Sequence, residues 1–219
     1  MTNQKHILDS LDYELKEYKK SVTALSKTDA GNLYITDDTL MFDWESIGKS
    51  YGFDESSSVD AIYCSFENGE LTLYFFEFKK HDLYDKYFDA KKQLEDYIND
   101  LEQCIFCLGY PQRVRKIKKN LVSKKIISLK TKPIESLILL YNILNELEIK
   151  PEEIVNIRKE YYIVSETPIN GNPTNFHRKG RSKEIFGFID KIKPFPFAEV
   201  QPINKITFLS LISNLKNKT

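Results

Sequence analysis

Three ionisable side chains, Asp60, Glu77 and Lys79, lie on two apolar segments that are joined by Asn68-Gly69. An Asn-Gly pair between such segments predicts a β-hairpin with a two-residue loop. In this register Asp60 faces Glu77, and Lys79 shares a face with Glu77 because side chains alternate along a strand. Two opposed carboxylates repel each other, and a divalent cation between them would remove the repulsion. The pattern predicts a metal site, in which Lys79 would position or deprotonate a water or neutralise charge on a phosphate.

The second segment of the hairpin is apolar on both faces, which predicts a strand in the middle of a sheet. Leu71, Leu73 and Phe75 lie on the face of Glu77, and Tyr74 and Phe76 lie on the other face. Burial at such a position makes an unpaired charge costly. The alternative is a hairpin that ends at the surface, with Glu77 and Lys79 both in water.

The composition is that of a globular protein with one substantial core. The chain has 219 residues, of which 41% are hydrophobic and 13% aromatic, and it has no apolar run of the roughly 20 residues that a membrane span needs. Three cysteines argue against a disulfide framework. We therefore expect no membrane association and a cytoplasmic location, with no signal peptide at the N-terminus.

The formal net charge is zero, but the charges are unevenly distributed. No acidic residue occurs between residues 103 and 134, a stretch that holds nine lysines and arginines up to Lys132. A second polar stretch, residues 167–183, has several basic residues and the turn-forming sequence of residues 170–173. Local basic surfaces of this kind are typical of contacts with nucleic-acid phosphates.

The first helix is expected over residues 4–26, with an apolar face at helical spacing. Glu14 lies at the edge of this face and could supply a third acid to a site below the helix; the simpler interpretation is an ordinary flanking charge. Glu45 is the rival for this role. Residues 30–51 indicate a short strand and a short helical turn.

The remaining elements follow from periodicity and from proline and glycine positions. We expect helices over residues 83–108, 133–147, 151–159 and 206–215, and strands over residues 160–165 and 184–192. Cys104 and Cys107 form a C-x-x-C without the second pair that a zinc site needs, so packing is their expected role.

An aspartate before a hairpin, followed by Glu77-Phe78-Lys79 on the next strand, resembles the PD-(D/E)XK nuclease superfamily. Gln93 and Tyr97 on the following helix are similar to the Q-x-x-x-Y motif of its RecB-like and Holliday-junction-resolvase-like branch. The resemblance covers about half the chain, and Val59 stands where the family has proline.

The resemblance implies an α/β fold: a central mixed β-sheet flanked by helices, a restriction-endonuclease-like core, with a C-terminal α+β extension. It implies one domain over residues 1–219, with a core of about residues 4–108 plus 160–166. A basic helical insertion would occupy residues 109–150, and the extension residues 167–219.

The resemblance also implies roles for single residues. Asp60, Glu77 and the Phe78 carbonyl would bind Mg²⁺ or Mn²⁺, Lys79 would be the catalytic lysine, and Gln93 and Tyr97 would position the strand being cut. Glu14 would fill the place of the acid on the first helix.

These features predict a metal-dependent DNA nuclease, directed by structure or ends, in repair, recombination or defence. RNA stays an alternative substrate, and a homodimer is compatible with cutting two strands. The other function is a catalytically inactive nucleic-acid-binding or scaffold protein of the same fold. In both, the expected backbone-binding residues are basic: Arg113, Arg115, Lys116, Lys118, Lys119, Lys124, Lys125, His177, Arg178, Lys179 and Arg181.

Overall fold

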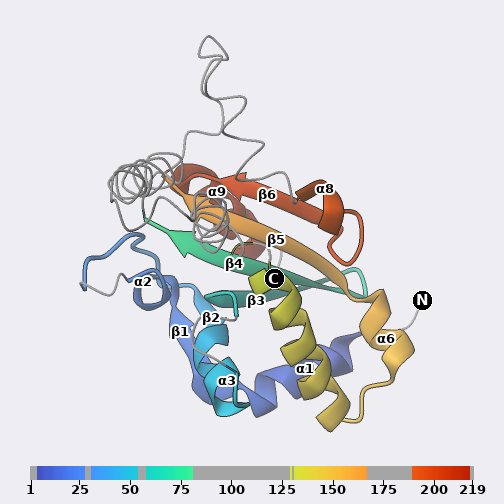
Figure 1. Cartoon of the computed structure of the whole chain (residues 1–219). Helices are drawn as coiled ribbons and strands as arrows, with labels where there is room; N and C mark the ends of the chain where they lie inside the picture. The colour runs from blue at the N-terminus through green and yellow to red at the C-terminus, as the bar shows by residue number, and fades with distance from the viewer. Residues whose placement is uncertain are drawn as a thin grey trace, which may run out of the picture.

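A six-stranded mixed sheet forms the centre of the protein (Figure 1). The computed structural model describes residues 4–27, 31–53, 58–80, 129, 131–166 and 189–217. The strand order follows the sequence: β1 (Lys19–Ser21), β2 (Leu40–Asp43), β3 (Ala61–Glu67), β4 (Glu70–Lys79), β5 (Arg158–Ser165) and β6 (Glu199–Ile203). The pairs from β1 to β4 are antiparallel, whereas β4 with β5 and β5 with β6 are parallel. The expected mixed α/β sheet is confirmed.

The hairpin between β3 and β4 sets the register of the sheet. Asn68 has φ 55° and Gly69 has φ 87°, and positive φ at both central residues is the signature of a type I′ turn. Ile62 pairs with Phe75, and Cys64 pairs with Leu73, as the two-residue loop predicts. Since β4 also pairs with β5, it is an interior strand, as expected from its two apolar faces.

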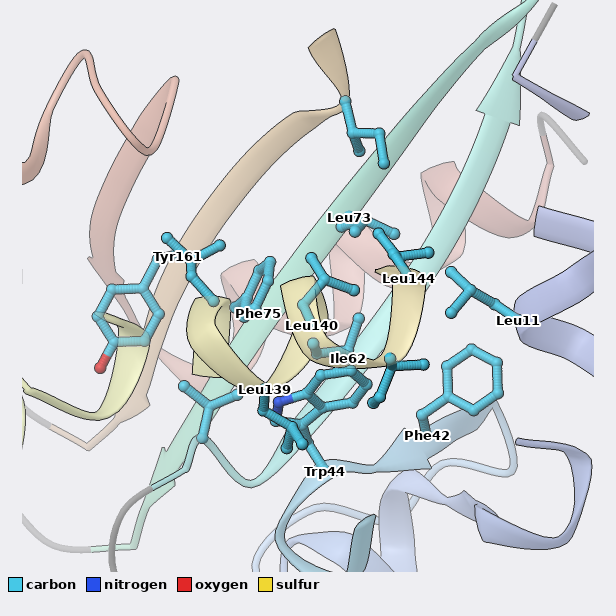
Figure 2. Close-up of a cluster of buried hydrophobic side chains, with 14 of the residues drawn as sticks. Leu11, Phe42, Trp44, Ile62, Leu73, Phe75, Leu139, Leu140, Leu144 and Tyr161 are labelled. Atoms are coloured by element: carbon cyan, nitrogen blue, oxygen red, sulfur yellow. The ribbon is translucent and has the colours of Figure 1, made fainter. Parts of the chain in front are cut away.

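Helices cover both faces of the sheet, and each face has its own apolar core. On one face lie α1 (Lys5–Glu14), α3 (Trp44–Ser50), a helix over residues 131–146 and α6 (Pro151–Asn156). The other face packs against α9 (Lys205–Lys216) and the short α2 (Val22–Leu25). Figure 2 shows Leu139, Leu140 and Leu144 of the 131–146 helix above the hairpin strands. No helix among the described residues is both long and apolar enough to cross a membrane.

The expected helix over residues 4–26 is wrong beyond Glu14. The chain continues as a 3-10 turn (Lys16–Tyr18), then as edge strand β1, and then as α2. Leu11 and Leu15 are buried in the core on one face of the sheet, but Val22 belongs to the core on the other. A single straight helix cannot reach both faces, so pairing of β1 with β2 replaces the helical hydrogen bonds.

The later elements agree in part with the expectations. The helix over residues 131–146, β5 and α9 fall where the sequence predicts them. The helix expected over residues 151–159 is wrong at its end, because α6 stops at Asn156 and β5 begins at Arg158. The expected strand over residues 184–192 is wrong at its end, because α8 (Ile189–Ile192) is helical. Ile189 and Ile192 both pack against the core, which fits the three-residue spacing of a helix. Residues 184–188 and the expected helix over residues 83–108, with Cys104 and Cys107, lie outside the described residues.

Lys159 offers a test of this packing. This residue of β5 is buried, and its ammonium donates to the carbonyl oxygens of Ile154 at 2.9 Å and Ile157 at 2.7 Å. Burial lowers the pKa of Lys159 to about 8. The folded protein therefore releases this proton at a lower pH than the unfolded chain, and stability rises with pH between about 8 and the unfolded value of about 10.4.

We predict that Lys159→Met removes this rise. Between pH 7.5 and 9.5, urea denaturation should show the wild type gaining about 1 to 2 kcal/mol of unfolding free energy relative to the variant. Parallel pH profiles of the two proteins would contradict the placement of this lysine.

Candidate active site

Asp60, Glu77 and Lys79 come together at one end of the β3–β4 hairpin. Asp60 directly precedes β3, and Glu77 and Lys79 lie in the last three residues of β4. The backbone fixes the aspartate: its N–H donates to the Phe76 carbonyl at 3.1 Å, and its Oδ2 accepts from the Phe78 N–H at 2.6 Å. The Asp60 carboxylate is thereby held against the strand that bears the other two groups.

Glu77 is the most buried charged group of this site, with no solvent exposure. Its Oε1 forms an ion pair with the ammonium of Lys79. Lys132 donates to both of its oxygens, at 2.9 Å to Oε1 and 3.1 Å to Oε2. A buried carboxylate is tolerated only when it is paired and hydrogen-bonded, and these two lysines meet that requirement.

Lys132 belongs to the site, although the sequence places it in the basic stretch expected to meet phosphates. It lies near the start of the 131–146 helix, its side chain is 10% exposed, and its Nζ is 3.7 Å from Asp60 Oδ1. A signal was present in the sequence: Lys132, Ser136 and Leu140 follow one another at helical spacing, and all three are buried. We call Asp60, Glu77, Lys79 and Lys132 the ion-pair cluster.

The 131–146 helix is also tied to the backbone beside Asp60. The Val59 N–H donates to Ser136 Oγ at 2.8 Å, and Ser136 is fully buried. On the other side of the strand end, the Trp44 N–H donates to the Asp60 carbonyl at 3.2 Å. The aspartate is thus positioned from the helix, from α3 and from β4 together.

The electrostatics of the ion-pair cluster separate its members. Burial raises the pKa of Asp60 to about 7, and the Glu77 charge adds to this, while Lys79, Lys132 and the Phe78 N–H oppose it. For Lys79, burial favours the neutral amine, but Glu77 and Asp60 outweigh it and raise the pKa above its ordinary value. Lys79 is therefore a protonated ammonium at neutral pH, which favours a charge-neutralising role over proton abstraction from a water.

A polar pocket with a volume of about 200 Å³ lies beside the ion-pair cluster, and Asp60 is the cluster member that lines it. The other charged and hydroxyl side chains of its wall come from three elements and a loop: Lys20, Lys27, Asp43, Glu45 and Ser46. Asp43 is held by Lys20 at 2.5 Å and caps α3 through the Ser46 N–H at 3.0 Å. The pocket gives a small polar ligand a path to Asp60.

The two candidates for a third acid have different surroundings. Glu14 is exposed at the end of α1, and its charge acts on Tyr51. Glu45 lines the pocket beside Asp60, and its charge is among those that raise the pKa of Lys79. The surroundings favour Glu45, whereas the helical pattern of the sequence favours Glu14.

Several expected site residues lie outside the described part of the chain. These are Gln93, Tyr97 and all the basic residues expected to bind the nucleic-acid backbone: Arg113, Arg115, Lys116, Lys118, Lys119, Lys124, Lys125, His177, Arg178, Lys179 and Arg181. Within the described residues, no group of three or more His, Cys, Asp or Glu side chains is arranged to hold a metal ion.

Comparison with known proteins adds no family assignment, because no family model, curated protein or solved structure matches this chain.

We predict that Asp60→Asn stabilises the metal-free protein above pH 7. A carboxyl whose pKa is about 7 when folded and about 3.9 when unfolded makes stability fall as the pH rises from about 4 to 7. The asparagine keeps an acceptor for the Phe78 N–H and carries no charge to bury. Its unfolding free energy should therefore exceed that of the wild type by roughly 1 to 2 kcal/mol after allowance for solvent screening.

The test is urea denaturation in EDTA at pH 5 and pH 8. The free energy of unfolding of the variant, relative to the wild type, should be higher at pH 8 than at pH 5. An Asp60→Asn protein that is less stable than the wild type at both pH values would refute the burial penalty.

Proposed function

We propose that this protein is a metal-dependent nuclease that hydrolyses phosphodiester bonds in DNA and is directed by structure or ends. The observation that carries the proposal is the convergence of Asp60, Glu77 and Lys79 at one end of the hairpin in the central sheet. A pocket that opens on Asp60 supports it, because a substrate phosphate needs a path to the acids.

The donor set fits Mg²⁺ or Mn²⁺ in its chemistry. Both are hard cations that prefer carboxylate, carbonyl and water oxygens, and the carboxylates of Asp60 and Glu77 and the carbonyl of Phe78 are oxygens of this kind. The charge of the site fits a dication less well, because Lys79 and Lys132 already neutralise the two acids. A metal ion can therefore bind Asp60 and Glu77 only when one of the two ammonium groups has moved away from them.

In the proposed reaction each residue has a separate task. Asp60 and Glu77 would hold the ion, which supplies a water of lowered pKa and polarises the scissile phosphate. Lys79, protonated at neutral pH, would neutralise charge that builds on the phosphate. The Phe78 N–H donates to Asp60 Oδ2. This hydrogen bond would hold the Asp60 carboxylate in a fixed position relative to the backbone of β4 during the reaction.

The polymer substrate is proposed on the sequence alone. The basic residues over 113–125 and 177–181 would contact the backbone, with affinity that falls as salt rises. DNA is the proposed substrate and RNA the alternative. A cytoplasmic location and a homodimer complete the proposal.

A second function is favoured by the position of Lys132. An ammonium that satisfies both oxygens of Glu77 and approaches Asp60 gives the acids a stable arrangement without any metal ion. A catalytically inactive nucleic-acid-binding or scaffold protein would have this property.

We predict that metal-dependent cutting is lost in Asp60→Ala and Lys79→Ala. Single-stranded, duplex and branched DNA should be incubated with Mg²⁺, Mn²⁺ or EDTA, and cleavage should fall by at least about 100-fold in both variants. Glu70→Gln, an exposed acid at the opposite end of β4, is the matched control and should cut like the wild type.

DNA binding in EDTA should persist in all these variants, because the expected backbone contacts lie elsewhere. Cutting that survives either substitution would remove the ion-pair cluster from the mechanism. Binding by the wild type with no cutting under any metal would favour the inactive function.

We further predict that Glu45→Gln lowers cleavage by about tenfold or more, whereas Glu14→Gln leaves it within about twofold. The reason is that Glu45 shares the pocket with Asp60 and acts on Lys79. The measurement is the initial cleavage rate at saturating Mg²⁺ for both variants. The reverse order of effects would assign the third acid to Glu14.

A further inference from the structure

The place between the two acids is taken by a side chain of the protein itself. Lys132 Nζ lies 2.9 Å and 3.1 Å from the oxygens of Glu77 and 3.7 Å from Asp60 Oδ1. A metal ion on Glu77 would use the lone pairs that this ammonium now occupies, because magnesium binds carboxylate oxygens at about 2.0–2.1 Å. Lys132 and a metal ion on this carboxylate therefore exclude each other.

The charge balance leads to the same result. With both carboxylates ionised, the two acids and the two ammonium groups sum to zero. A dication added to the intact ion-pair cluster would leave an excess positive charge beside Glu77, which has no solvent exposure. Interactions between charges are strong where water is scarce. The metal ion needs one lysine to leave.

Lys132 is the lysine placed to leave. Lys79 lies on the same strand as Glu77 and forms its ion pair with Oε1 of that residue. Lys132 comes from a separate element, the 131–146 helix, and directly precedes Pro133. Its four-carbon stem can turn without a change in the strand that bears the acids.

We infer that Lys132 is a resident counter-cation that inhibits metal binding: its ammonium occupies the metal position between Glu77 and Asp60, and metal binding requires its displacement. This inference rests on the proposed function, because it concerns the same site. In the metal-free protein the Lys132 ammonium then occupies the metal position. The free energy needed to move Lys132 away lowers the affinity for the metal ion.

The test measures Mn²⁺ affinity by isothermal titration calorimetry and by the electron paramagnetic resonance signal of free Mn²⁺. Lys132→Met keeps an unbranched side chain that is one atom shorter and removes the charge, and it should bind Mn²⁺ at least about tenfold more tightly than the wild type. Lys132→Arg keeps the charge and should stay within about threefold of the wild type. Lys159→Met, which removes a buried ammonium bound to backbone carbonyls, is the matched control and should not change the affinity.

A second measurement uses the wild type and does not depend on whether a variant folds. Lysine acylation read by mass spectrometry should leave Lys132 protected in EDTA, because the residue is 8% exposed, and should modify it several-fold faster in saturating Mn²⁺. Acylation of Lys132 that is equally slow with and without Mn²⁺ would overturn the inference, as would a Lys132→Met protein that binds Mn²⁺ no more tightly than the wild type.

The outcomes separate this inference from the proposed function. Metal-dependent cutting that needs Asp60, together with unchanged Mn²⁺ affinity in Lys132→Met, would overturn the role of Lys132 and leave the nuclease proposal standing. Tighter Mn²⁺ binding by Lys132→Met without cutting by any protein would support the role of Lys132 and reject the nuclease. No Mn²⁺ binding by the wild type or by Lys132→Met would reject both.

Discussion

A carboxylate with no access to water, that of Glu77, is the constraint on which the rest of the site depends. It sits on an interior strand, so water cannot compensate its charge, and the protein must supply cations from within. Lys79 comes from the same strand and Lys132 from a helix whose residues are distant in sequence. The ion pairs thus fasten the 131–146 helix to the sheet at the end of the hairpin, where Ser136 adds a hydrogen bond to Val59.

The two acids have different surroundings and so offer different chemistry. Glu77 is buried and paired with two ammonium groups, and in the metal-free protein these ion pairs hold the 131–146 helix against the sheet. Asp60 faces a pocket, and burial raises its pKa to about 7. A partly accessible acid with a raised pKa beside a buried acid that two lysines neutralise is typical of functional sites, where charged groups are held at a cost in stability. The same two lysines pair with Glu77 and partly offset the electrostatic cost of burying Asp60.

The sequence was sufficient for the hairpin and its register, because Asn68-Gly69 and a two-residue alternation are local signals. The same alternation identified β4 as an interior strand with Glu77 and Lys79 on one face. Local signals gave wrong predictions where contacts with residues distant in the sequence determine the structure. Residues 4–26 have a helical pattern, yet Leu11 and Val22 serve opposite faces of the sheet. The local charge pattern places Lys132 on a basic surface, because its partner, Glu77, is 55 positions away and charge counts along the chain carry no information on such pairs.

Metal binding at this site depends on the exchange of an ammonium for a metal ion between the two acids of the ion-pair cluster. A crystal structure of the wild type soaked in Mn²⁺, with anomalous data collected at the manganese absorption edge, tests this most directly. We expect an anomalous peak within coordination distance of Asp60 and Glu77 and a Lys132 side chain that has moved away from both. Lys132 in its place on Glu77, with no peak beside Asp60 at saturating Mn²⁺, would contradict it.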